Sequence, residues 1–232
     1  MSDTSQGPGW WLASDGKWYP PDLTPGAAQP PVPQQPFAGA GAGYPVTVTY
    51  AAPMEIARWR ALVHLFMAIP HFIILYALGL FSGILTFISF FMVLFTTRVP
   101  DGIQDLQAMV MRYSNRVVAF IALLTETYPP FEFDSVRNDP GGYPIATSLV
   151  GSGELARVRC LQWILLIPHV IVLYVLGIVG FFAYIIQWFI VLITAKRSEG
   201  ISNYIIGVTR WATRVQAYGR FLTDQYPPFS LD

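Results

Sequence analysis

Two histidines lie in nearly identical apolar surroundings, His71 in IPHFIILYALG and His169 in IPHVIVLYVLG. Imidazole can ligate haem iron or another metal and can relay protons near neutral pH. An ionisable side chain inside an apolar segment marks a functional site by default. Such chemistry would bring the two histidines face to face. Alternatively, each stays neutral and hydrogen-bonds within its own repeat, to carbonyls that the preceding proline releases or to Tyr76 and Tyr174.

We favour the second interpretation, because no carboxylate lies near either histidine to orient an imidazole as a metal ligand. Haem held by His71 and His169 is therefore the disfavoured alternative, and we expect no cofactor and no metal. The single cysteine, Cys160, excludes an internal disulfide and a multi-thiolate metal site. The sequence also contains no pattern of a nucleophile with its base, so we expect a chain that is not an enzyme.

The histidine motifs belong to a tandem duplication. Residues Ile69–Phe131 align without a gap to Ile167–Phe229, and both copies end in YPPF. A short stretch before each apolar run also repeats, as YPVTVTY and YPIATSLV, and its alternation is typical of a strand. The predicted organisation is a tryptophan-rich hairpin module at 1–21, a Pro/Gly/Ala/Gln-rich linker at 22–43, membrane repeats at 44–131 and 143–231, and a linker at 132–142.

Each repeat contains a long run without Asp, Glu, Lys or Arg, namely Leu62–Thr97 and Cys160–Ala195. The chain is 53% hydrophobic and 12% charged, and each run is about twice the roughly 18 residues that indicate a membrane span. Each run is either a tight hairpin turning at its glycines or a single tilted span broken at Pro70 or Pro168.

The positions of the cations favour the hairpins. Two hairpins leave all 14 lysines and arginines on one side, whereas two single spans divide them between both sides. We therefore expect an all-α membrane protein with a short transmembrane or re-entrant helical hairpin in each repeat. Both termini would be cytoplasmic, and the protein would be multi-pass in the inner (plasma) membrane. The strand-like pieces, with FEFD after the first YPPF, would form a small cytoplasmic sheet.

An amphipathic helix is predicted after each apolar run, at Ile103–Thr125 and Ile201–Thr223, and the double proline of YPPF would stop it. Lying in the cytoplasmic interface, these helices would direct arginines at anionic headgroups. The equal alternative is that the arginines pair with acids of the chain, such as Glu55, Asp101 and Glu126, and fix the fold. The candidate headgroup-binding residues are Arg112, Arg116, Arg210 and Arg214.

The N-terminal stretch PGWWLASDGKWYPP places Asp15-Gly16 between aromatic residues, which is a strong hairpin signal. Aromatic side chains on such a ribbon can grip a proline-rich or lipid partner. The candidate partner-binding residues are Trp10, Trp11, Trp18 and Tyr19.

The repeated elements IPH…LY..G and R…YPPF resemble a bacterial, largely actinobacterial, integral-membrane family described as domain of unknown function 4389, and both copies match. The N-terminal module is similar to short tryptophan-rich modules of actinobacterial membrane proteins. The resemblance implies a membrane protein and supplies no catalytic residues.

Two kinds of function are compatible with these features. We expect a non-enzymatic integral-membrane accessory or scaffold protein that organises a membrane complex or a lipid surface. The alternative is a small transporter, channel or lipid-handling protein that uses the duplicated histidines. The expected partners are membrane lipids, with a larger membrane protein complex as a second candidate. A net charge of zero gives no reason to expect a nucleic acid.

Overall fold

A computed structural model describes residues 11–12, 18–19 and 43–232. The chain divides into two units, and the first ends at Gln35. In it, β1 (Trp11–Leu12) pairs antiparallel with β2 (Trp18–Tyr19). The predicted Asp15-Gly16 turn, Trp10, the linker up to residue 42 and the side chains of the partner-binding candidates Trp11, Trp18 and Tyr19 lie outside the described residues.

Each long apolar run folds as one continuous helix, so the predicted hairpins are wrong. These helices are α1 (Arg58–Thr96) and α3 (Gln162–Thr194), and the 3-10 turn η2 (Arg157–Leu161) precedes α3. The alternative of a break at the proline is also wrong, because Pro70 and Pro168 lie inside the helices. A continuous helix keeps the backbone groups of an apolar segment paired, which a turn would interrupt.

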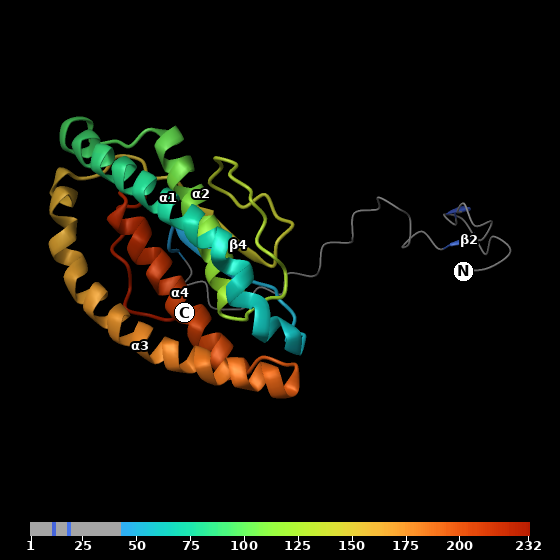
Figure 1. The fold of residues 1–232 in the computed structure, drawn as a ribbon. Coiled ribbons are helices and arrows are strands. Elements are labelled where there is room, and N and C mark those ends of the chain that lie inside the picture. Colours follow the sequence, from blue (N-terminus) through green and yellow to red (C-terminus); the bar gives the residue numbers. More distant parts are fainter. Residues whose placement is uncertain (1–10, 13–17, 20–42) are drawn as a thin grey trace. The chain divides into compact units, whose positions relative to one another are not determined.

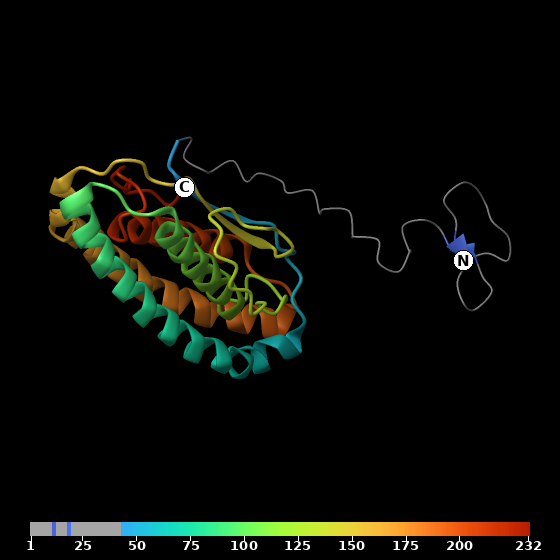
Figure 2. The same cartoon turned by 90° about the horizontal axis from the view of Figure 1, so that it is seen from above.

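The predicted amphipathic helices form as α2 (Asp101–Ile121) and α4 (Glu199–Gly219), but more than half of each is buried. Figures 1 and 2 show both helices between the layer of α1 and α3 and a small sheet. Each helix ends before YPPF, and the residues that reverse the chain have a positive φ, 55° at Leu123 and 61° at Phe221. The double proline is therefore not what ends these helices.

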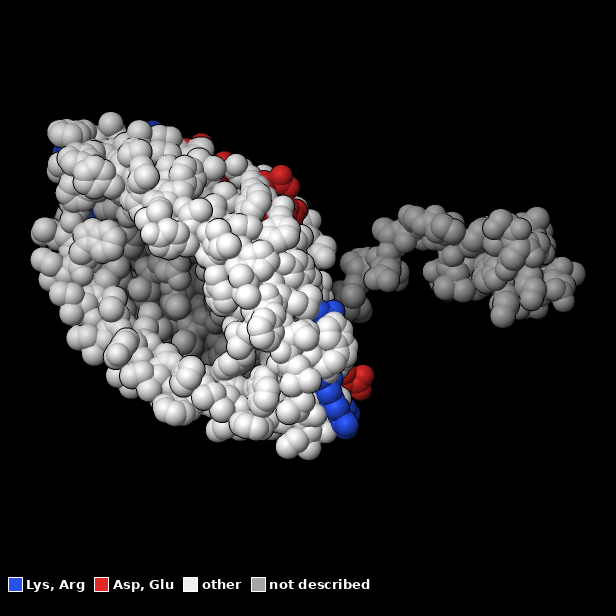
Figure 3. All heavy atoms as spheres, viewed as in Figure 1, with Lys and Arg blue, Asp and Glu red and all other residues white. Residues whose placement is uncertain are grey.

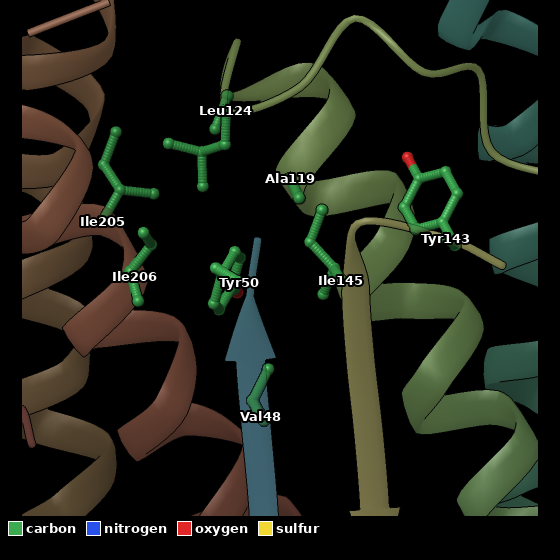
Figure 4. Close-up of a cluster of buried hydrophobic side chains, with 9 residues drawn as sticks. Val48, Tyr50, Ala119, Leu124, Tyr143, Ile145, Ile205 and Ile206 are labelled. Carbon is green, nitrogen blue, oxygen red and sulfur yellow. The ribbon is translucent and has the colours of Figure 1, made fainter. Parts of the chain in front are cut away.

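One strand from each repeat forms the sheet. The strands β3 (Val46–Tyr50) and β4 (Ile145–Leu149) pair antiparallel, with Tyr50 opposite Ile145. FEFD forms no strand, which corrects that prediction. Figure 4 shows Val48 and Tyr50 of β3 and Ile145 of β4 between Ala119 of α2 and Ile206 of α4. Because β3 also accepts a hydrogen bond from α4, through Arg210 Nε to Val48 O at 3.1 Å, the two repeats are interlocked.

The two long helices, which we call the arms, run antiparallel and meet only near their ends (Figure 1). At one end Trp188 Nε1 donates to Ala61 O at 2.7 Å. At the other end the contact runs through η2, the turn before α3, where Arg157 Nε donates to Leu94 O at 3.1 Å. Between these contacts the arms bow apart, and the space-filling view shows a hollow there (Figure 3). The duplication therefore builds a pseudo-two-fold frame around a central opening.

Candidate functional site

The histidines lie in two separate aromatic clusters, each built by a single repeat. His71 Nδ1 is 2.6 Å from the hydroxyl of Tyr113, and its ring stacks on Phe131 of the first YPPF at 4.8 Å between centroids. His169 Nδ1 accepts from Trp211 Nε1 at 3.0 Å, and its ring stacks on Phe229 at 3.8 Å. This geometry supports hydrogen bonding within each repeat.

The bond from Trp211 also fixes the tautomer of His169. An indole nitrogen is only a donor, so Nδ1 must be the unprotonated nitrogen and a neutral ring carries its proton on Nε2. No hydrogen bond or ring contact joins His71 to His169 within the described residues. Over the same part of the chain, no group of three or more His, Cys, Asp or Glu side chains is arranged to hold a metal ion.

The predicted partners Tyr76 and Tyr174 do not contact the histidines, since each is 72% exposed on the outside of an arm. The tyrosines of YPPF take that place. Tyr128 Oη donates to Met67 O at 3.3 Å, and Tyr226 Oη donates to Leu165 O at 2.9 Å. Both carbonyls lie in the helical turn before the proline. In each repeat, the YPPF segment therefore packs against the Pro-His pair of the same repeat.

The arginine candidates are fixed inside the protein. Arg116 forms ion pairs with Glu132 at 2.5 Å and with Asp139 at 2.9 Å, and its side chain is only 1% exposed. Arg112 donates to the carbonyls of Asp134 and Val136, at 2.5 and 2.9 Å.

In the second repeat, Arg214 donates to Ser230 O at 2.5 Å, and Arg210 holds β3 as described above. Burial lowers the pKa of both Arg112 and Arg214. These contacts correspond to the alternative in which the arginines fix the fold, although their partners are mostly main-chain carbonyls. None of the acids proposed from the sequence pairs with them.

Most of the exposed large apolar side chains of the described residues lie on the arms. Only 28% of the most apolar window of α1 and 11% of that of α3 are buried, whereas the core helix of a soluble protein is mostly covered. Figure 3 shows this face almost free of charged atoms, which gather at its margin. Large exposed side chains along the arms include Ile69, Phe72, Ile73, Tyr76, Leu80, Ile84, Ile167, Ile171, Tyr174, Val175, Ile178 and Phe182.

Two pockets lie between the arms and the helices behind them. The first, of about 670 Å³, is lined by Gly79, Ser82, Gly83 and Thr86 of α1, by Trp163 and Leu166 of α3, and by Gln216, Gly219 and Arg220 at the end of α4. The second, of about 320 Å³, is lined by Gly177, Gly180, Phe181 and Tyr184 of α3, by Val118, Ile121 and Ala122 at the end of α2, and by Tyr204 of α4.

The duplication relates part of the two linings. Seven lining residues of the first pocket correspond to residues of the second, namely Gly79, Ser82, Gly83, Thr86, Gln216, Gly219 and Arg220 to Gly177, Gly180, Phe181, Tyr184, Val118, Ile121 and Ala122. Sequence reasoning missed this site, since small and apolar residues carry no motif. One signal was present in the aligned repeats: Arg220 stands where the first repeat has Ala122.

Comparison with protein families matches residues 58–132 and 159–230 to the Domain of unknown function (DUF4389). The two matched segments correspond to the two repeats. Neither curated proteins nor solved structures give a match.

Proposed function

The chain belongs to the Domain of unknown function (DUF4389) family, with two copies in tandem, and we propose that it is a non-enzymatic membrane protein that lays its arms in one leaflet. In that position it would organise the lipid surface or a membrane complex. The observation that carries the proposal is the continuous uncharged face of α1 and α3 (Figure 3). Soluble monomers rarely expose contiguous apolar patches larger than a few hundred Å².

The distribution of polar groups supports an orientation parallel to the membrane plane. In Figure 2 the arms lie on one side of α2 and α4, and the sheet with the segment 131–142 lies on the other. That segment carries Glu132, Asp134, Arg137 and Asp139. With the arms in lipid, the exposed groups of this segment, such as Asp134, face water on the far side of the molecule.

A spanning orientation fits the same geometry poorly. A straight helix of 39 residues such as α1 measures about 58 Å, whereas the hydrocarbon layer is about 30 Å thick. The segment 131–142 follows α2 from Arg116 to Asp105, through the ion pairs of Arg116 with Asp139 and Arg137 with Asp105. In a spanning protein this irregular chain and the open sheet edges would face lipid, which does not occur in the hydrocarbon region.

The in-plane orientation keeps every lysine and arginine on one side of the bilayer, which is the distribution expected of the cytoplasmic face. We therefore propose attachment to the cytoplasmic leaflet of the plasma membrane, with both termini in the cytoplasm. A non-enzymatic role is supported by the hydrogen bonds of His71 and His169 within their own repeats, and by the bonds that hold Arg112 and Arg116 inside the described part of the chain.

Vesicle flotation of the full-length protein tests this proposal. Detergent is removed in the presence of uncharged phosphatidylcholine vesicles, and the mixture is centrifuged through a density gradient in high salt. Insertion of an apolar face predicts that the protein floats with the vesicles, because salt screens charge attraction and leaves apolar burial intact. Recovery of folded protein at the bottom of the gradient would contradict the proposal.

A further inference from the structure

The first pocket contains a cation that the second pocket lacks. Arg220 follows the last residue of α4 and lines the pocket, and its Nη2 donates to Gln216 Oε1 at 3.0 Å. Its Nη1 is buried and has no hydrogen-bond acceptor in the described part of the chain. No carboxylate there forms an ion pair with Arg220 either. Burial lowers the pKa of Arg220 to about 10, so the guanidinium is still charged at neutral pH.

Arg220 thus leaves a charged donor at the wall of a pocket without an acceptor. Buried charges in proteins are paired, and a buried donor without an acceptor points to a missing partner. Arg116 and Arg159 also leave a buried nitrogen without an acceptor, but both form ion pairs with carboxylates of the described residues. Arg220 therefore lacks an anionic partner among the described residues.

The comparison of the two repeats shows that the fold does not require this cation. At the equivalent position, α2 is followed by Ala122, and the second pocket forms around it without a charge. Two neighbouring positions of the first pocket also carry side chains that differ from those of the second pocket. Gln216 replaces Val118, and Thr86 replaces Tyr184.

The first pocket also has open space at a position where a large side chain occupies the second pocket. Gly83 corresponds to Phe181, and a Cβ added at Gly83 or at Gly79 would meet nothing within 4 Å. A volume of about 670 Å³ lies within the range of about 300–1,000 Å³ of ligand pockets, and the walls at Phe87, Phe90 and Val170 are apolar. The pocket therefore combines room for a hydrocarbon chain with one charged group.

We propose that the pocket between the arms binds one anionic phospholipid of the leaflet, with an acyl chain along the apolar walls and the headgroup phosphate at Arg220. This inference rests on the proposed function, because the hollow opens on the face that we place in lipid (Figure 3). The opening favours a membrane lipid over a ligand from water. A phosphate oxygen supplies the acceptor that Nη1 lacks, in a charge-assisted hydrogen bond.

Native mass spectrometry of the full-length protein in mild detergent tests the proposal. The probes are phosphatidylglycerol and phosphatidylcholine with the same acyl chains, added together in equal amounts. We expect the wild type to retain one phosphatidylglycerol in clear preference to phosphatidylcholine. Equal retention of the two lipids by the wild type would overturn the proposal.

Two variants copy the second pocket into the first. Arg220→Ala should reduce the preference for phosphatidylglycerol by roughly tenfold, as expected when one charge-assisted hydrogen bond is lost. Gly83→Phe keeps the cation and fills the space, so it should reduce retention of both lipids. The control is Arg98→Ala, which removes the same charge from a side chain that is 68% exposed, and it should leave the preference unchanged.

Flotation of the same variants separates this proposal from the previous one. The pocket variants should float with phosphatidylcholine vesicles like the wild type, because the outer surface of the arms is intact. Variants that float but still prefer phosphatidylglycerol as the wild type does would overturn the lipid site and leave the membrane face standing. A wild type that fails to float would overturn the proposed function itself.

Discussion

Replacing Ile73 and Ile171 together by aspartate should release the protein from vesicles. The two residues are equivalent in the repeats, lie away from the ends of the arms, and are 69% and 58% exposed. A carboxylate in hydrocarbon costs about 2.5–3.5 kcal/mol at the bilayer centre and less toward the interface. A short side chain such as aspartate cannot extend its charge to water as lysine does. Two such groups should lower membrane affinity by roughly a hundredfold or more in the flotation assay.

The matched control carries the same added charge on the other side of the molecule. Val136 and Val150 are 41% and 70% exposed, and both lie with the sheet and the segment beside it. The double variant Val136→Asp with Val150→Asp should float like the wild type. Equal release of both double variants would mean that charge alone, and not its position on the arms, decides membrane binding, which contradicts the account. Circular dichroism in detergent checks that both variants keep their helices.

Replacing Arg116 by alanine should destabilise the protein more than any exposed ion-pair substitution. Arg116 is 1% exposed and holds Glu132 and Asp139, and the side chain of Asp139 is itself 2% exposed. Removing one partner of a buried pair leaves the other charge uncompensated, which costs about 3–5 kcal/mol. The segment 131–142 would lose both of its ion pairs with Arg116 of α2. Denaturant unfolding in mild detergent, followed by circular dichroism, measures the change in the free energy of unfolding.

Arg98→Ala is the control for this measurement as well. Arg98 pairs with Glu154 at 2.6 Å, but both side chains are 68% exposed. Exposed pairs contribute about 0–1 kcal/mol, so the free energy of unfolding should hardly change. Comparable losses for the two variants would show that the buried pair is not what fixes the segment to α2.

The duplication, the two strands and the two charged helices could be predicted because each depends on local pattern. The alternation of side chains in YPVTVTY predicted the strand β3, and a single alignment of the two repeats placed their YPPF motifs at equivalent positions. The path of the apolar runs could not be predicted in this way. Glycines such as Gly79 and Gly177 are compatible with a turn or with a helix, and the repeats interlock through contacts far apart in the sequence.

The arginines illustrate the same limit at the level of a site. The spacing of Arg112 and Arg116 places them on one face of α2, but it does not reveal what covers that face. The segment after YPPF folds back over it and supplies Glu132, Asp139 and two carbonyls. Likewise, hydrogen-bond partners of His71 and His169 came from the next helix of the repeat, at Tyr113 and Trp211. Such partners are set by packing and not by spacing along the chain.

Side-specific labelling of two single cysteines tests the in-plane orientation most directly. Arg98 lies at the end of α1 and Lys196 just after the end of α3, at opposite ends of the pair of arms, and their side chains are 68% and 66% exposed. The variants Arg98→Cys and Lys196→Cys are made with Cys160→Ser and treated with a membrane-impermeant maleimide, on intact cells and after lysis. The account predicts that neither cysteine reacts in intact cells and that both react after lysis. Reaction of one of them in intact cells would mean that the arms cross the bilayer, and it would contradict the account.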